Sequence, residues 1–381
     1  MQHYLRYLIP FINPDIRYWR REARLLNWLT FIWLSIGLIT LISASYSDDV
    51  LYYQDGFHTL KRQMIGVAIG FAGFNLITQI PLRKTSKFAP VMLLFCLGLI
   101  FLTYFVSPSI NGAKRWIPVG SLLMQPSELI KPFLVMQSAY VFARWKQLKR
   151  DLQVTWIIVF SLVLAGILGQ PNLSTTALCG MSLWLIAIAA ELPWKYIISV
   201  SLSGMLFAAI SVYLNPYQWT RIASFLNPWQ DAQGDGYQLV QSLLAIASGG
   251  VSGSGLGLSQ QKLFYLPIGT TDLIFAVYAE EFGFIGCILL LGGFWLICLR
   301  LIWIAHTAKD DFGSLIVIGV LTIIAFQTVV NICMTIGLAP ITGIPLPWMS
   351  YGRSSLLSGF ISIGLIESVA RDRESKISSN Y

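Results

Sequence analysis

Long apolar runs alternate with short polar segments along the whole chain. A helical run of about 20 residues crosses the hydrocarbon core of a bilayer, so each run predicts one spanning helix. The runs predict ten spans, at residues 26–46, 60–80, 87–106, 126–143, 153–170, 174–191, 194–214, 272–304, 312–337 and 348–370. Because ten is an even number, we expect both ends of the chain on the same side of the membrane.

Two connections between the runs are long, at residues 107–125 and 215–271. A long connection in a compact bundle usually carries function. Within the second, Val240, Leu243, Leu244 and Ala247 repeat at helical spacing, which predicts an amphipathic helix. We expect this helix on the bilayer surface or across the mouth of the bundle.

Composition agrees with an all-α polytopic membrane protein. Hydrophobic residues make up 55% of the chain and charged residues only 12%, which is more apolar surface than a water-soluble fold can bury. The net charge of +8 is no sign of nucleic-acid binding, because the basic residues stand between apolar runs. The five cysteines lie inside apolar runs and the three histidines are scattered, so the sequence predicts neither a histidine metal site nor a catalytic triad.

The distribution of lysine and arginine predicts the topology. Most of the 26 lie in segments on the side of the chain ends, which the positive-inside rule assigns to the cytoplasm. We therefore expect residues 1–25 to be a cytoplasmic segment, residues 26–370 a transmembrane domain that includes an extracytoplasmic loop at 215–271, and residues 371–381 a cytoplasmic tail. The remaining cations fall on the outer side: Lys61, Arg62, Lys114, Arg115, Lys131, Arg221, Lys262 and Arg353.

Asp272 is the first candidate for chemistry, because it stands where the long outer loop re-enters an apolar run. A charged side chain at the edge of an apolar span costs free energy to bury, so an acid there is often functional. The sequence Thr-Thr-Asp before a helix also suits an N-cap, and the residues alone leave both interpretations open. Glu280 and Glu281 lie more than ~10 Å further along the same helix, so we expect them to serve other helices or cations.

Glu128 and Lys131 form the second candidate, near the outer start of the fourth span. Their i, i+3 spacing allows an ion pair. Such a pair is either structural or the lining of a polar cavity that orients a substrate headgroup.

Two further features, a set of cations and a glycine-rich segment, each allow a structural or a functional interpretation. Lys114, Arg115, Arg221, Lys262 and Arg353 are either scattered surface charges or, as a group, a site for an anionic headgroup. The glycines of residues 248–257 predict a flexible loop or a cradle for phosphates, but with no strand before them they form no dinucleotide motif.

Several motifs together resemble the SEDS family of polytopic glycosyltransferases, which includes RodA, FtsW and SpoVE. They run through the whole chain: Asn111-Gly-Ala-Lys-Arg-Trp-Ile117, Gln125-Pro-Ser-Glu-Leu-Ile-Lys131, Gln170-Pro-Asn-Leu-Ser-Thr-Thr176, Gly236-Tyr-Gln-Leu-Val-Gln-Ser242, Tyr265-Leu-Pro267, Thr271-Asp-Leu-Ile-Phe-Ala276 and Leu346-Pro-Trp-Met-Ser-Tyr-Gly352. The segments 227–231 and 259–267 resemble the division branch, FtsW, and phrases in the second and third motifs resemble its cyanobacterial members.

The resemblance implies that the protein polymerises peptidoglycan from lipid II outside the cytoplasmic membrane. It implies a catalytic role for Asp272 and roles in activity for Arg115, Glu128 and Lys131. We add Lys114, Lys262 and Arg353 as candidate substrate-binding residues. The implied partners are a class B penicillin-binding protein with transpeptidase activity and other membrane proteins of the division machinery. No organic cofactor is implied.

The chain departs from the family pattern in three places. Ile268 and Thr270 replace a Glu and a His, so neither of those side chains can be required here. Arg353 replaces a glycine in the last motif, and Asn172 replaces an Asp in the third.

The implied reaction needs few groups. A sugar hydroxyl attacks an anomeric carbon that bears a lipid diphosphate, so one general base suffices if the leaving charge is stabilised. Asp272 is the expected base; alternatively it holds a divalent cation, Mg²⁺ or Mn²⁺, on the diphosphate. An elongation enzyme like RodA, a lipid II flippase and a non-enzymatic scaffold for a transpeptidase remain as alternatives.

Overall fold

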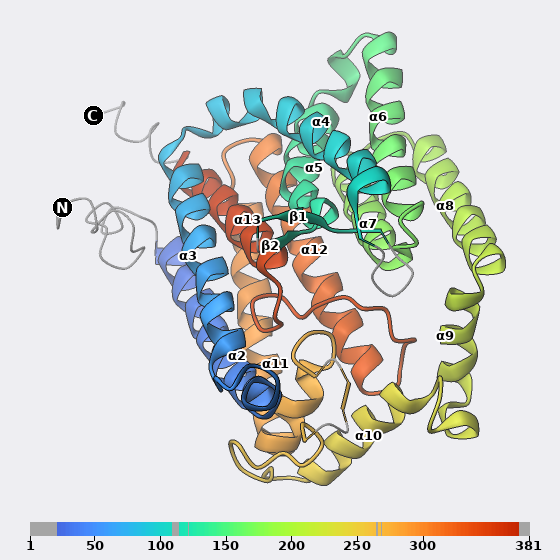
Figure 1. The fold of residues 1–381 in the computed structure, drawn as a ribbon. Helices are drawn as coiled ribbons and strands as arrows, with labels where there is room; N and C mark the ends of the chain where they lie inside the picture. Colours follow the sequence, from blue (N-terminus) through green and yellow to red (C-terminus); the bar gives the residue numbers. More distant parts are fainter. Residues whose placement is uncertain (1–20, 109–113, 121, 264–265, 268, 373–381) are drawn as a thin grey trace.

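We describe the protein from a computed structural model, which covers residues 21–108, 114–120, 122–263, 266–267 and 269–372. Most of the two predicted cytoplasmic segments, residues 1–20 and 373–381, therefore lies outside the described residues, as does Ile268. Figure 1 shows the described chain as a bundle of long helices, with the second long connection, residues 215–271, packed at its lower end.

Each of the ten predicted spans corresponds to one long helix of the described chain. They are α2 (Arg21–Tyr53), α3 (His58–Gln79), α4 (Leu82–Val106), α5 (Pro126–Ala143), α6 (Arg150–Leu168), α7 (Leu173–Ala189), α8 (Trp194–Leu214), α11 (Ile274–His306), α12 (Asp311–Thr335) and α13 (Arg353–Asp372). The first extends beyond the predicted 26–46 at both ends. The last begins later than the predicted 348, because the preceding residues form turns in which Trp348 has a φ of 57°.

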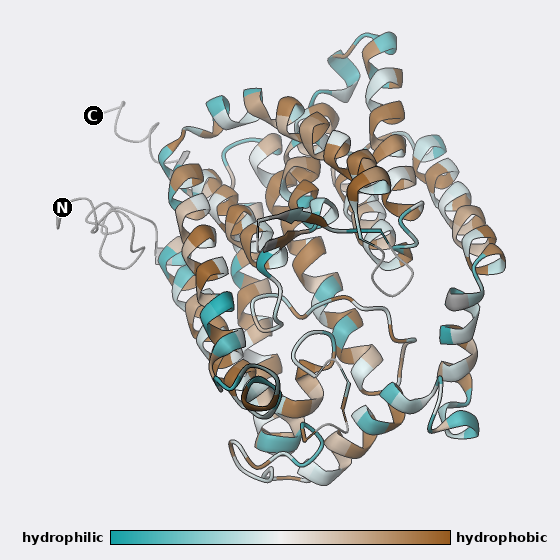
Figure 2. Cartoon of the chain, viewed as in Figure 1, coloured by the Kyte–Doolittle hydropathy of each residue, from teal (hydrophilic) through white to brown (hydrophobic). Residues whose placement is uncertain are grey.

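Six of the described helices are long and apolar enough to cross a membrane by length and composition alone: α2, α4, α6, α8, α11 and α12. The others are shorter or more polar. Helix α3 carries a buried Gln63, for example, and α5 carries Glu128 and Lys131. Figure 2 shows apolar residues along the middle of the helices and more hydrophilic ones toward their ends and in the loops. The chain is an all-α polytopic membrane protein.

Helices α5 and α12 form the centre of the bundle. Helix α12 packs against α5, α7 and α11, while α4 covers another side of α5. Helix α13 lies along α3, and α2 lies along α11. In α8 only Ile197 and Ser211 are buried, and Figure 1 shows this helix at the edge of the bundle.

The two long connections contain structure of their own. In the first, β1 (Ile117–Val119) and β2 (Leu122–Met124) pair antiparallel, which the sequence pattern did not predict. The second contains α9 (Pro216–Leu226), the 3₁₀ turn η3 (Pro228–Asp231) and α10 (Tyr237–Gly249). Helix α10 confirms the predicted helix, and it packs across the lower end of α11 and α12. Of the predicted apolar face, Val240 is buried but Leu244 and Ala247 are exposed, because the helix packs through Leu239, Val240, Ser242 and Ala245.

The glycine-rich segment after α10 is docked against α11. Its amide groups at Ser254 and Gly255 donate to the carbonyls of Glu280 and Glu281, at 2.9 and 3.0 Å. These N–H groups are therefore already bonded to protein. The segment is a loop, as predicted, and the amides of Ser254 and Gly255 are not free to bind a phosphate.

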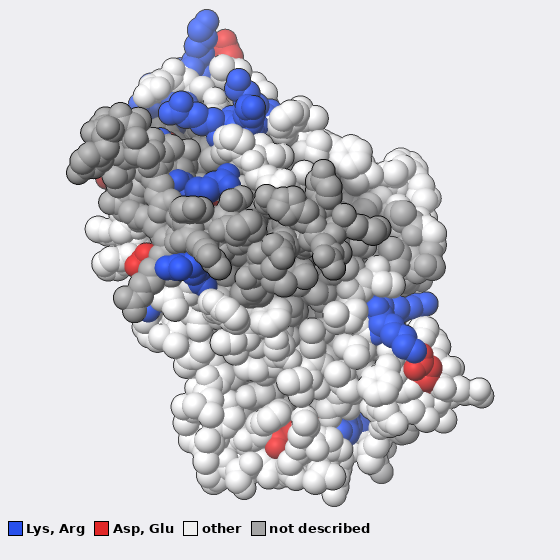
Figure 3. Space-filling view, turned by 90° about the vertical axis from the view of Figure 1, so that its left-hand side faces the viewer, with Lys and Arg blue, Asp and Glu red and all other residues white. Residues whose placement is uncertain are grey.

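Positive charge is unevenly distributed between the two ends of the bundle. On the face in Figure 3, lysines and arginines gather at the upper end, where the turn between α5 and α6 lies in Figure 1. That turn carries Arg144, Lys146, Lys149 and Arg150.

Candidate functional site

Asp272 lies in the turn that leads into α11. The helix begins at Ile274, its N-cap is Leu273, and no side chain caps it. The interpretation of Asp272 as an N-cap was therefore wrong, because the carboxylate is not used on the helix end. The side chain is half-buried and available for another role.

Three hydrogen bonds fix the backbone of this turn. The Tyr351 amide donates to the Thr270 carbonyl at 2.9 Å, and the Ser350 hydroxyl donates to the Thr271 carbonyl at 2.6 Å. The Asn331 side chain of α12 donates to the Asp272 carbonyl at 2.8 Å. The segment before α13, which contains the Ser-Tyr-Gly motif, therefore holds Asp272 in place.

The surroundings of the Asp272 carboxylate shift its protonation. Burial raises the pKa of Asp272 from its ordinary value to about 6, against the opposing effects of the Arg221 charge, a hydrogen bond from Thr271 and the Arg115 charge. A carboxylate with a pKa near 6 is mostly ionised at neutral pH and is a stronger base than an ordinary aspartate. This is the protonation behaviour of a general base.

Arg115 and Arg221 bring positive charge to Asp272 from two distant parts of the chain. The Arg115 guanidinium donates to the Gln170 carbonyl at 2.9 Å and also to the Pro171 carbonyl. The Arg221 guanidinium, from α9, donates to the Ile341 carbonyl at 2.7 Å. These bonds hold both guanidinium groups in fixed positions, so their charges are preorganised.

The segment that precedes the Ser-Tyr-Gly motif closes the other side of the carboxylate. A Cβ atom at Gly343 would lie 3.4 Å from Asp272 Oδ2, so this glycine backbone borders the carboxylate directly. One residue earlier, the Thr342 carbonyl accepts a bond of 3.1 Å from Ser174 at the start of α7. The site is thus assembled from the connection at 107–125, α7, α9, the turn before α11 and the segment before α13.

The predicted pair of Glu128 and Lys131 is present. Lys131 Nζ lies 2.6 Å from Glu128 Oε1, and the two side chains are only 2% and 6% exposed. Asn172, which replaces an Asp of the family motif, accepts a bond of 3.3 Å from the Thr175 amide and caps α7. A neutral amide performs this capping as well as a carboxylate does.

Comparison with known proteins shows the family of the chain. The FtsW/RodA/SpoVE family, described as "Cell cycle protein", matches residues 23–375. The chain belongs to this family. It is 46% identical to a "Probable peptidoglycan glycosyltransferase FtsW" from the cyanobacterium Synechocystis, over 97% of this chain and 94% of that protein. It is 36% identical to "Stage V sporulation protein E" of Bacillus subtilis, over 91% of this chain and 96% of that protein.

Solved structures agree with this assignment. One is described as "Structural coordination of polymerization and crosslinking by a peptidoglycan synthase complex"; it aligns with a TM-score of 0.73 at 26% identity and covers 91% of this chain and 97% of that chain. The crystal structure of Thermus thermophilus RodA aligns with a TM-score of 0.67 at 26% identity, over 91% of this chain and 96% of that chain. The predicted membership of the FtsW/RodA/SpoVE family is confirmed.

Of the three remaining predicted site residues of this family member, Lys114 and Lys262 have polar contacts of their own, and Arg353 packs its stem against α3. Lys114 is exposed, and its Nζ lies 3.5 Å from the Tyr104 carbonyl. Lys262 forms a buried ion pair with Glu281 at 2.9 Å. Arg353 begins α13, with its stem against Gly66 of α3. Roles for these three residues in substrate binding stay predictions.

Arg221 is the residue that the sequence analysis undervalued. It was one of several outer cations, and no feature of the sequence distinguished it from the others. Its proximity to Asp272 depends on how α9 lies against the segment before α13, and this packing leaves no mark on the local pattern. The signal that could have selected it is its place in the long connection at 215–271, because long connections often carry function.

The described residues do not form a protein metal site. No group of three or more His, Cys, Asp and Glu residues comes together in the described ranges. Asp272 instead has the positive charges of two arginines beside it, which repel a cation. The described residues around Asp272 therefore do not fit a metal held by the protein.

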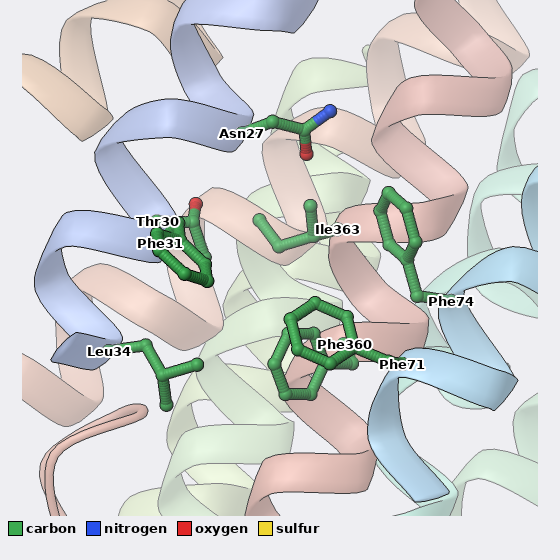
Figure 4. A pocket seen from close by; sticks show the side chains of 8 residues that line it. All are labelled: Asn27, Thr30, Phe31, Leu34, Phe71, Phe74, Phe360 and Ile363. Carbon is green, nitrogen blue, oxygen red and sulfur yellow. The ribbon is translucent and has the colours of Figure 1, made fainter. Parts of the chain in front are cut away.

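Two cavities lie away from Asp272. One, of about 20 Å³, lies between α2, α3 and α13 and is lined by the largely apolar set in Figure 4, with room for one water molecule. The other, of about 330 Å³, lies between the end of α5, the turn after α7 and the start of α12. Neither of these two cavities contains a predicted site residue.

Proposed function

We propose that this FtsW/RodA/SpoVE family member is a peptidoglycan glycosyltransferase that polymerises lipid II during cell division, with Asp272 as its general base. The observation that carries the proposal is the half-buried carboxylate of Asp272, whose pKa is raised to about 6 beside two fixed guanidinium groups. The names of its FtsW relatives support the division role over an elongation role.

The proposed reaction balances with these groups. The Asp272 carboxylate accepts the proton of a sugar hydroxyl as the oxygen attacks the anomeric carbon of a second lipid-linked sugar. The new glycosidic bond forms as the bond to the diphosphate breaks, and the lipid diphosphate leaves with the electron pair. Arg115 and Arg221 stabilise the negative charge that develops on the diphosphate.

In the proposed topology, both ends of the chain are cytoplasmic and Asp272 lies outside. The gathering of lysines and arginines at the upper end in Figure 3, opposite the end with α10, supports this orientation. Residues 1–25 and 371–381 would then be cytoplasmic, and residues 215–271 would form the main extracytoplasmic loop of the domain at 26–370.

The proposed partners are lipid II and a class B penicillin-binding protein, together with other division proteins of the membrane. A solved relative in a peptidoglycan synthase complex supports a transpeptidase partner. The flippase alternative requires charged groups along the depth of a passage. Here Asp272, Arg115 and Arg221 meet at one end of the bundle, which favours chemistry there over translocation.

The proposal is tested with purified protein and labelled lipid II in detergent and in proteoliposomes. We expect wild type to make glycan polymer and Asp272→Ala to make none, while the variant remains folded and monodisperse. Asp235→Ala is the matched control, because Asp235 is an exposed acid of the same outer loop. Polymer made by Asp272→Ala would overturn the proposed base, and labelled lipid II translocated without polymerisation would favour the flippase.

Each assay is run with and without a class B transpeptidase. If wild type forms no polymer in either case, the proposed function is wrong. If the Asp272→Ala variant supports the same crosslinking as wild type, the scaffold alternative gains support.

A further inference from the structure

A buried ionic cluster lies at the far end of the segment that carries Asp272. Lys262 Nζ is 2.9 Å from Glu281 Oε1 and donates to Ser43 Oγ at 2.7 Å. Ser43 in turn donates to Glu281 Oε1. The side chains of Lys262 and Glu281 are 7% and 0% exposed. The cluster therefore joins α2, the outer loop and α11 at one point.

A buried ion pair of this kind needs an explanation other than stability. Removing two charges from water costs about as much as their attraction returns, and an apolar pair of similar volume is often as stable. Where such pairs are kept, a role in fixing one geometry is a recurrent reason. The position of this pair indicates which geometry it fixes.

Helix α11 is broken at Gly283, where φ is 65° and ψ is −167°. The break separates residues 274–282 as a short rod of ~13 Å. Asp272 stands just before the start of this rod, and Glu281 stands near its end. A change in the tilt of the rod therefore moves Asp272.

Backbone contacts secure the break itself. The amide of Phe284 donates to the Gly250 carbonyl at 3.0 Å, and the amide of Gly255 donates to the Glu281 carbonyl at 3.0 Å. These bonds satisfy the backbone groups that the break frees within the apolar bundle. They act as a pivot but do not by themselves determine the direction of the rod.

The carboxylate next to Glu281 secures the loop before Lys262. Glu280 accepts a bond of 2.8 Å from the Gln260 amide and another from the Ser259 hydroxyl. Both acids of the rod thus hold residues 259–262, which lead directly into the segment that ends at Asp272.

A small apolar cluster continues the same connection to α2. Ala44, Leu266 and Leu273 are buried together with Ala245, Ala276 and Val277. Ala44 follows Ser43, and Leu273 follows Asp272. The polar cluster and the apolar cluster therefore attach the Asp272 segment to the same point of α2.

From these contacts we propose that Lys262, Glu281 and Ser43 are positioning residues, which set the tilt of the rod at 274–282 and thereby aim the Asp272 carboxylate. The inference rests on the proposed glycosyltransferase function. It gives Lys262 a different role from the predicted binding of substrate. A displacement of about 1 Å at a reacting group lowers rates by as much as 10²-fold, so the pair matters to turnover more than to substrate affinity.

The test is a double-mutant cycle in the full-length protein with lipid II as substrate. Lys262→Met leaves the Glu281 carboxylate buried without its partner, and Glu281→Gln leaves the Lys262 ammonium in the same state. We expect each single variant to lose about 10- to 100-fold in kcat, with KM changed by less than about threefold. We expect the double variant to recover to within about tenfold of wild type, because no buried charge is left unpaired.

A second measurement reports on the order of the Asp272 segment and does not depend on enzymatic activity. Hydrogen exchange of the amides at 269–276 is expected to increase in each single variant and to return toward the wild-type level in the double variant. Lys61→Met is the matched control, because Lys61 forms an exposed ion pair with Asp55 at 2.6 Å and its loss is expected to change neither reading. Lys262→Arg keeps the charge and is expected to retain most activity.

The outcomes separate the two proposals. If Lys262→Met raises KM at unchanged kcat and the double variant behaves like it, Lys262 binds substrate and the positioning role is wrong. Unchanged exchange in both single variants also overturns the positioning role. If wild type makes no polymer, the proposed function fails, whereas an active wild type without coupling in the cycle refutes only the inference.

Discussion

Gly343 borders the Asp272 carboxylate, so that a Cβ at position 343 would lie 3.4 Å from Oδ2. Its φ of 72° belongs to the left-handed region, which favours glycine. The site therefore combines a carboxylate with a glycine backbone beside it, which leaves room for an incoming hydroxyl.

We predict that Gly343→Ala lowers the polymerisation rate about tenfold, because the added methyl group occupies space beside the base. The left-handed backbone also costs about 1 kcal/mol of folding free energy. Gly337→Ala is the matched control, since Gly337 has a φ of 74° but faces Leu243. Equal losses of rate in the two variants would mean that backbone strain alone is responsible.

The rate of polymerisation is expected to rise with pH through the pKa of Asp272, which burial raises to about 6. The base acts when deprotonated, so the rate increases as pH rises and levels off above about pH 7. At pH 5 about a tenth of the carboxylate is ionised, and the rate should be about a tenth of the plateau. Single-turnover rates between pH 4.5 and 8 provide the measurement, and a rate that is flat over this range would contradict the assignment.

Arg221→Gln should move this profile as well as lower its plateau. The positive charge of Arg221 lowers the pKa of Asp272, so its removal raises that pKa and shifts the midpoint of the profile to higher pH. Arg221→Lys keeps the charge and should shift the midpoint less. A lower plateau with an unmoved midpoint in Arg221→Gln would show that the guanidinium does not act on Asp272.

Sequence alone predicted the helices, because apolar runs determine where helices cross a membrane. It left the role of Asp272 open, and the resemblance to the family, through the Thr-Asp motif, selected Asp272 as the candidate base. The sequence could not show that Asp272 leaves the helix end uncapped or that Arg221 comes near it. Those features depend on contacts between segments far apart in the chain, such as the bond from Arg221 to the Ile341 carbonyl.

The break at Gly283 was also invisible in the sequence. Glycine is common within transmembrane helices, so hydropathy continues across the break without change. The docking of the glycine-rich loop at 248–257 was not predicted either, because its partner, the backbone of residues 280–285, could not be identified from the pattern. Long-range backbone pairing of this kind has no local signature.

Lys131→Met is predicted to destabilise the folded protein by roughly 3–5 kcal/mol, because it leaves the buried Glu128 carboxylate without its partner. The double variant with Glu128→Gln should recover most of that loss, since both charges are removed. The temperature of unfolding in detergent is the measurement. A double variant that is as stable as wild type but inactive would assign the pair to the substrate site, whereas an active one would make it structural.

Gly283→Ala is predicted to prevent stable folding of the first part of α11, residues 274–282. A Cβ at Gly283 would lie 2.2 Å from the Gly253 amide nitrogen, and the φ of 65° at Gly283 is unfavourable for alanine. Backbone cannot yield as a flexible side chain does, so the bonds from Gly250 and Gly255 to α11 would be lost.

Gly292→Ala is the matched control within the same helix, because a Cβ there meets nothing within 4 Å and alanine favours the helix by about 1 kcal/mol. Limited proteolysis of residues 249–262 and the unfolding temperature provide the readings. If Gly283→Ala matches Gly292→Ala in both, the backbone contact between the two glycine positions does not hold the rod that carries Asp272.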